Sequence, residues 1–183
     1  MRFRFSLFGE VFATRPRGAK VRAQVEEVLR TTPDDEALVL DCEGVQLMSY
    51  SFADEVIGML LLARAAGTLG ERAILLTSAG EEVLSSIVLS LERRKLILPF
   101  LTQDGIRLVG APEHLNATFV AAFNRGEFRV TELAEDLGIT THALNNRLKA
   151  LLGAGIVVRR VGIPSAGGRE YIYRVVVPAM KGA

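Results

Sequence analysis

The chain has 183 residues, of which 49% are hydrophobic, and its formal net charge is +1. That much apolar material can fill a packed core, which excludes an intrinsically disordered chain. Cys42 is the only cysteine, which excludes an intrachain disulfide and a thiolate metal cluster. His114 and His142 are the only histidines and lie far apart in the sequence. We therefore expect neither a metal nor a cofactor, and no enzymatic activity.

The charge is distributed unevenly along the chain. Residues 1–110 contain 13 Lys/Arg and 15 Asp/Glu, a balance of −2, whereas residues 111–183 contain nine and six, a balance of +3. Residues 140–174 contain six Lys/Arg and a single acidic residue, Glu170. A cluster of cations in one region is typical of a nucleic-acid surface.

No segment has the pattern of a membrane span or a secretory signal. The longest apolar run, Val56 to Ala66, has 11 residues and is interrupted by Gly58 and Arg64. A membrane-spanning helix needs about 20 residues, so this run is too short. The opening residues, MRFRFSLFGEVF, contain no apolar run followed by small residues. We expect no membrane association and a cytoplasmic location.

In the first 110 residues, strand patterns alternate with helix patterns. Charged or polar and apolar residues alternate over Arg2–Phe8, which predicts a half-buried strand. The further predicted elements are a strand over 11–14, a helix from Pro16 to about 30, a buried strand over 37–42, a helix from Phe52 to about 66, a strand over 72–77, a helix over 81–93, and a hairpin of 95–101 with 106–109. This order predicts an α/β domain. Gly110-Ala111-Pro112 predicts its end, which gives domains of 1–110 and 111–183.

Two motifs of this first domain carry a family resemblance. The first is Phe12-Ala13-Thr14-Arg15 with Gly18, and the second is Ser51-Phe52-Ala53-Asp54-Glu55, which follows Asp41 and Val45. With these motifs the domain resembles the STAS fold of anti-anti-sigma factors, and more closely the STAS-like bacterial domains that share both motifs. The resemblance implies a sensing, interaction or dimerisation domain, and a kinase-like anti-sigma factor as the type of protein partner.

The resemblance also indicates where a switch would lie. Anti-anti-sigma factors have Asp-Ser-Ser-Gly at the start of the helix after the third strand, and phosphorylation of a Ser there is their switch. Alignment on Asp41 and Gly44 places Ser49-Tyr50-Ser51-Phe52 at this position, so Tyr50 occupies the acceptor column. We therefore expect Ser51 to act as a helix N-cap. Two alternatives stay open: a switch at Ser49 or Ser51, and a partner-binding or ligand-binding cluster of Arg15, Asp54 and Glu55.

The pattern of residues 129–157 predicts two short helices joined by a tight turn. Thr131 and Thr140 are of the type that caps helices, and Gly138 suits the turn because glycine enters the left-handed conformation without a Cβ penalty. Leu144, Leu148 and Leu151 recur at helical spacing and predict the buried face of the second helix. Its outward face then carries Thr141, His142, Asn145, Asn146 and Lys149.

A β-hairpin is predicted directly after these helices. IVVRRVG and YIYRVVV are strand patterns, and IPSAGGRE between them is rich in turn formers. With TELAEDLGIT, NNRLKALLGAGIV and GGREYIYRV, the segment resembles the winged helix–turn–helix regulators of bacteria, such as the MarR and ArsR groups. The resemblance implies a winged helix-turn-helix (α+β) domain in which the second helix lies on DNA and the hairpin is the wing.

The whole sequence thus predicts an α/β protein, a STAS-like domain followed by a winged helix-turn-helix domain. The expected function is a DNA-binding transcriptional regulator that binds double-stranded DNA as a homodimer. Amide side chains can pair with adenine edges, so Asn145 and Asn146 are candidate base-reading residues. The candidate phosphate contacts are Lys149, Arg159, Arg160 and Arg169, with Thr141 and His142 beside them. The alternative is a protein-interaction adaptor, or an anti-anti-sigma-like factor, whose winged helix docks a protein.

Overall fold

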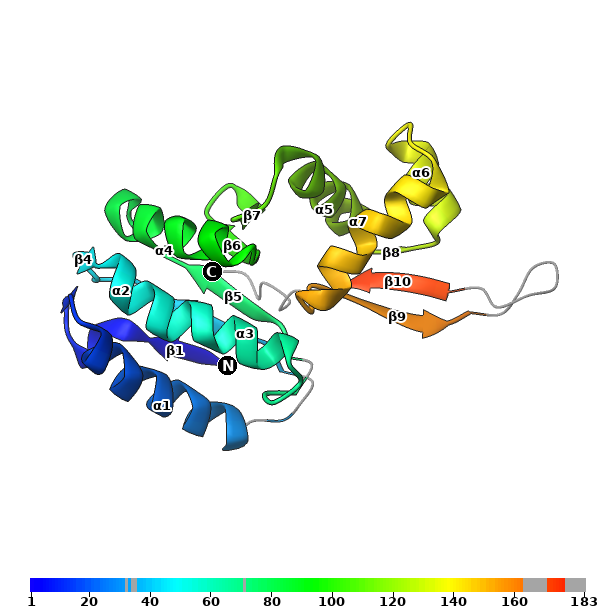
Figure 1. Cartoon of the computed structure of the whole chain (residues 1–183). Helices are drawn as coiled ribbons and strands as arrows, with labels where there is room; N and C mark the ends of the chain where they lie inside the picture. Colours follow the sequence, from blue (N-terminus) through cyan, green and yellow to red (C-terminus); the bar gives the residue numbers. More distant parts are fainter. Residues whose placement is uncertain (32, 34–35, 71, 163–170, 177–183) are drawn as a thin grey trace. The chain divides into compact units, whose positions relative to one another are not determined.

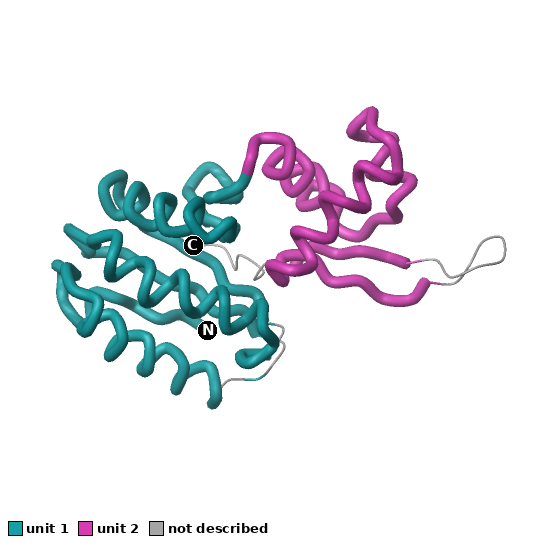
Figure 2. Tube along the Cα trace, viewed as in Figure 1, with its two compact units in different colours: residues 1–111 teal, residues 112–183 magenta. Residues whose placement is uncertain are grey.

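A computed structural model describes residues 1–31, 33, 36–70, 72–162 and 171–176 (Figure 1). The chain divides into two compact units, Met1–Ala111 and Pro112–Ala183 (Figure 2). The division lies one residue from the boundary expected from the sequence. Among the described helices, none is long and apolar enough to cross a membrane.

The first unit contains a five-stranded sheet of the α/β class. Its strands are β1 (Arg2–Arg4), β3 (Leu38–Asp41), β5 (Ile74–Thr77), β6 (Leu98–Thr102) and β7 (Gly105–Val109), in the order β1-β3-β5-β6-β7. The first four strands are parallel and β7 is antiparallel to β6. Two short strands, β2 (Val11–Phe12) and β4 (Leu47–Met48), pair in parallel outside this sheet.

The helices of the first unit lie on one face of the sheet (Figure 1). They are α1 (Arg15–Thr31), α2 (Tyr50–Ala53), the π-helical segment η2 (Asp54–Gly58), α3 (Met59–Ala65) and α4 (Glu81–Arg94). Alternate strand residues such as Phe3, Leu40 and Leu76 point into the core with Val25 of α1 and Ile87 of α4. Because the successive parallel strands of this sheet, β1, β3, β5 and β6, lie side by side in that order, right-handed crossovers place the connecting helices on the same face.

The strand predicted over Arg2–Phe8 is shorter than expected. β1 ends at Arg4, and Phe5–Phe8 forms a 3-10 turn, η1. The chain turns because Phe8 stacks on Phe3, with ring centroids 5.1 Å apart, while Phe5 is fully buried. Leu7 is 78% exposed. The alternation of residue types predicted a strand to Phe8, whereas the packing of Phe8 on Phe3 turns the chain after Arg4.

The helix after β4 begins earlier than predicted, which corrects the role of Ser51. Ser49 is the N-cap, since its hydroxyl accepts a hydrogen bond from the Phe52 amide at 3.2 Å and donates to the Ala13 carbonyl at 2.7 Å. Ser51 lies within the first helical turn. Either serine is a suitable cap by residue type, so the hydrogen bond to the preceding loop decided between them.

The described residues of the second unit form three helices and a three-stranded antiparallel sheet. The elements are α5 (Glu113–Arg125), β8 (Glu127–Phe128), α6 (Val130–Asp136), α7 (Thr141–Gly153), β9 (Val157–Val161) and β10 (Tyr171–Val175), and the strand order is β8-β10-β9. β8 has only two residues and was not predicted. Phe128 of β8 stacks on Tyr173 of β10, with ring centroids 5.7 Å apart, so this strand closes the core of the unit.

Candidate nucleic-acid interface

The turn between α6 and α7 is held by caps on both helices. Thr140 accepts a hydrogen bond from the Ala143 amide at 3.2 Å, which confirms it as the N-cap of α7. Gly138 has φ +63°, as the turn requires. The prediction that Thr131 caps α6 is wrong. Arg129 is the N-cap, and its backbone amide donates a hydrogen bond to the Glu132 carboxylate at 2.9 Å, which is the Glu half of a capping box.

Helix α7 has a buried apolar face and an exposed polar face. Leu144, Leu148 and Leu151 are buried, as predicted. The opposite side carries exposed polar residues, which are Thr141, His142, Asn145, Asn146 and Lys149. Asn146 Nδ2 and His142 Nε2 lie 3.4 Å apart, so these two side chains support each other one turn apart. The carboxamide of Asn145 makes no hydrogen bond within the described part of the chain and is open to a partner.

Arg147 attaches α7 to α5. Its guanidinium donates to Thr118 Oγ1 at 2.9 Å and to the His114 carbonyl at 3.3 Å. The Thr118 hydroxyl in turn donates to the same carbonyl at 2.8 Å. This arginine therefore fixes the angle of α7 in the unit, a role that the sequence pattern did not suggest.

The hairpin β9–β10 places the candidate arginines on two different faces of the sheet. Residues paired across antiparallel strands share a face, and Arg159 pairs with the buried Tyr173. The guanidinium of Arg159 lies 4.9 Å from the ring of Tyr171 on this inner side. Arg160 must point to the outer side, where it forms an ion pair with Glu127 at 3.0 Å. Arg169 lies outside the described residues.

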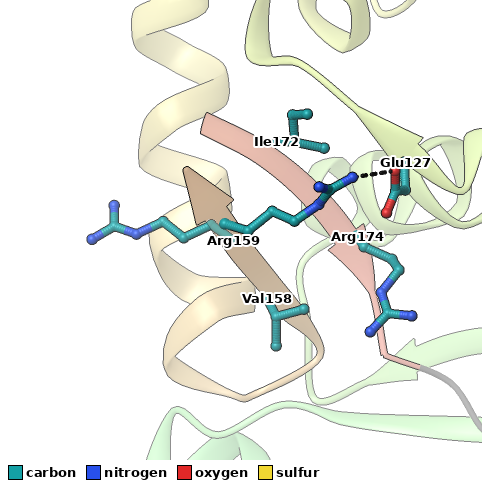
Figure 3. Close-up of a pocket in the computed structure, with 6 residues that line it drawn as sticks. Glu127, Val158, Arg159, Ile172 and Arg174 are labelled. Carbon is teal, nitrogen blue, oxygen red and sulfur yellow. Dashed lines mark hydrogen bonds and ion pairs between the residues drawn. The ribbon is translucent and has the colours of Figure 1, made fainter. Parts of the chain in front are cut away.

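A shallow cavity of about 290 Å³ lies on the hairpin (Figure 3). Its borders are Glu127, Val158, Arg159, Arg160, Ile172 and Arg174. The sequence predicted Arg159 and Arg160 as equivalent phosphate contacts, but the alternation of the strand separates them. A DNA duplex that binds to the face with Arg159 cannot contact Arg160 equally, and the converse also holds.

In the first unit, Arg15, Asp54 and Glu55 do lie together. Arg15 Nη2 donates to Asp54 Oδ2 at 2.9 Å, and Arg15 Nη1 donates to Glu55 Oε2 at 3.1 Å. Arg94 also binds Asp54, and Arg22 binds Glu55 at 3.1 Å. Hydrogen bonds from Arg94 and then Arg15 lower the pKa of Asp54, although its burial acts in the opposite direction.

Arg94 and Arg22 were missed because no local spacing connects them to Asp54 and Glu55. The cluster joins α1, η2 and α4, and Asp54 is only 3% exposed. The five charged groups pair with one another, which is the arrangement of a structural network. Ser49 and Ser51 are half-buried beside it at the start of α2.

Within the described residues, no three His, Cys, Asp or Glu side chains gather to hold a metal ion. Cys42 is buried, and burial followed by the neighbouring charge of Asp41 raises the pKa of its thiol to about 12. Comparison of the chain with protein-family models, curated proteins and solved structures found no match.

Proposed function

We propose that the protein is a DNA-binding transcriptional regulator, in which the second unit is a winged helix-turn-helix domain and α7 is its recognition helix. The observation that carries the proposal is the outward face of α7. Asn145, Asn146, His142 and Lys149 are all exposed there, opposite three buried leucines. The neutral amides have little attraction for phosphate, but each can form a bidentate pair with an adenine edge.

The capped turn supports the same function. Caps at Arg129 and Thr140, the left-handed Gly138 and the Arg147 contacts hold the two helices in fixed positions. Preorganised side chains lose less conformational entropy on binding. The excess of cations in residues 140–174 supplies the attraction to phosphate that precedes base reading.

The first unit is proposed to be a STAS-like domain that serves sensing, protein contact or dimerisation. One recognition helix makes few base contacts, and regulators of this kind bind two half-sites about one helical turn apart, as dimers. We therefore expect a homodimer. Light scattering of the full chain at tens of micromolar, with and without duplex, should return twice the chain mass. A monomer under both conditions would contradict the dimer and leave the DNA-binding proposal standing.

The experiment for DNA binding is titration of random-sequence duplex with the full chain at several salt concentrations. The logarithm of the binding constant should fall linearly with the logarithm of the salt concentration, with a slope of about −0.9 for each neutralised phosphate. Absence of binding at low salt would remove the DNA proposal and leave the protein-interaction adaptor in its place.

A further inference from the structure

The outer face of the β9–β10 sheet has a regular arrangement of charge and apolar surface. Ile172 pairs with Arg160, and Arg174 pairs with Val158, so these four side chains share one face in two cross-strand pairs. Glu127 of β8 pairs with Arg174 and lies at the border of the same face. We call these five residues the outer hairpin face. It is distinct from the outward face of α7 and from the inner side, where Arg159 lies.

The two arginines of this face are diagonal neighbours, because Arg160 opposes Ile172 and Arg174 lies two residues further along β10. Diagonal neighbours in an antiparallel pair are about 7–8 Å apart. Alternate residues of an extended peptide are separated by about 6.6 Å, twice the rise of a strand, and point to the same side. Carboxylates at positions i and i+2 of such a peptide therefore have about the spacing of the two arginine positions, and the long arginine side chains can reach them.

We propose that the outer hairpin face binds an extended acidic peptide segment whose carboxylates alternate along the chain. Arg174 is exposed and has no carboxylate partner among the residues that the structure describes. Arg160, whose side chain is 64% exposed, is held only by Glu127, which is itself 52% exposed. A peptide carboxylate that forms a bidentate pair with either guanidinium gains a charge-assisted hydrogen bond with directional geometry.

The remaining residues of the face favour a peptide over a phosphate backbone. Val158 and Ile172 are half-buried and offer an apolar floor beside the arginines. An apolar side chain of a peptide gains from covering them, whereas a phosphate gains nothing there. Glu127 adds a negative charge to this face, which disfavours a polyanionic phosphate backbone more than a short peptide with two carboxylates. This inference does not depend on whether α7 binds DNA.

The test uses the full chain and two labelled pentapeptides of equal composition. Glu-Thr-Glu-Thr-Val places both carboxylates and the valine on one side of an extended chain, whereas Thr-Glu-Glu-Thr-Val divides the carboxylates between two sides. Fluorescence anisotropy should show about tenfold tighter binding of the first, the effect of one additional charged hydrogen bond. Equal binding of the two peptides would overturn the proposal.

Variants of the hairpin identify the surface. Arg160→Gln and Arg174→Gln should each weaken binding of the alternating peptide about tenfold. Arg159→Gln is the matched control, since Arg159 is next in the same strand and borders the cavity, but its guanidinium lies against the ring of Tyr171 on the inner side. It should change binding less than about twofold. Glu127→Gln should tighten binding about threefold, because it removes an internal competitor for Arg160. Equal losses from Arg159→Gln and Arg174→Gln would contradict the assignment to this face.

A duplex titration distinguishes the peptide from nucleic acid. Arg174→Gln should weaken binding of random-sequence duplex less than Lys149→Gln does, because it removes general charge attraction and no phosphate contact. If Arg174→Gln instead weakens duplex binding as much as Lys149→Gln does, the outer hairpin face is a phosphate contact and the peptide proposal is wrong. If the wild-type chain binds the alternating peptide but no duplex, the inference stands and the proposed DNA-binding function fails.

Discussion

Arg94 of α4 and Asp54 of η2 form a two-point ion pair, in which Nε and Nη2 of the arginine lie 2.5 Å and 2.9 Å from the two carboxylate oxygens. Arg15 binds the same carboxylate from α1, and Ser90 approaches it at 3.4 Å. One buried side chain therefore connects three helices. Its position in a π-helical segment shows that the backbone deviates from α-helical geometry here.

We expect Asp54→Asn to destabilise the first unit by about 1.5–3 kcal/mol at pH 7, because hydrogen bonds between charged groups are lost. The lowered pKa of Asp54 determines the pH dependence. A carboxylate whose folded pKa is depressed stabilises the fold above its unfolded pKa of about 3.9, and this contribution is lost as pH falls through the folded value. Urea unfolding should therefore show the difference from wild type shrinking below about pH 4.

The control for this experiment is Glu27→Gln, which removes an exposed ion pair with Arg30 on α1. Exposed pairs contribute about 0–1 kcal/mol, so this variant should unfold nearly as wild type does. A loss for Asp54→Asn that is no larger than that for Glu27→Gln would show that the network adds little to stability.

The corrected cap predicts a contrast between two serines. Ser49→Ala should lower the free energy of unfolding by about 1 kcal/mol, the usual loss for an N-cap. Ser51→Ala should lie within about 0.5 kcal/mol of wild type, because the Ser51 hydroxyl makes no hydrogen bond in the described part of the chain. Equal losses of unfolding free energy in the two variants would show that Ser51 also acts as a cap. Stoichiometric phosphate on either serine from native cells would indicate a switch.

The thiol of Cys42 should be inert in the folded protein. Since burial raises its pKa to about 12, almost no thiolate is present at pH 8. A disulfide reagent such as Ellman's should label the native protein very slowly and label it at once in urea. Fast labelling of the native protein would show that this strand end opens readily.

Arg147 and Lys149 are both cations of α7, but the structure gives them different roles. Lys149 is exposed on the outward face, while Arg147 donates to Thr118 of α5 at 2.9 Å. Lys149→Gln should reduce the salt slope of duplex binding by about one and leave stability unchanged. Arg147→Gln should reduce thermal stability and have a smaller effect on the slope. The reverse result would show that Arg147 contacts the phosphates of the duplex.

The sequence predicted the elements with the strongest periodicity correctly. The parallel strands at β3 and β5, helix α4, the antiparallel hairpin of β6 and β7 and the leucines of α7 all appear within a few residues of expectation. In each of these segments local pattern and burial agree, so the period of the apolar residues is sufficient.

The errors occur where long-range contacts decide between locally equivalent choices. Ser49 and Ser51 are equally good caps, and only the hydrogen bond to the Ala13 carbonyl selects Ser49. Arg94 lies 40 residues from Asp54, so no spacing rule relates them. The phosphate contacts predicted at Arg159 and Arg160 stay a prediction, but adjacent strand residues must point to opposite faces, so the two arginines are not equivalent. β8 is two residues long, too short for a period to appear.

The most direct measurement of the central claim compares Asn145→Ala with Lys149→Ala in binding to a selected operator and to random-sequence duplex. The selected operator comes from enrichment of random duplexes on the wild-type chain. Asn145→Ala should reduce the preference for the operator by about 1–3 kcal/mol while random duplex binds nearly as before. Lys149→Ala should weaken both duplexes alike. If Asn145→Ala also weakens both alike, or if neither duplex is bound at low salt, α7 is not a base-reading helix.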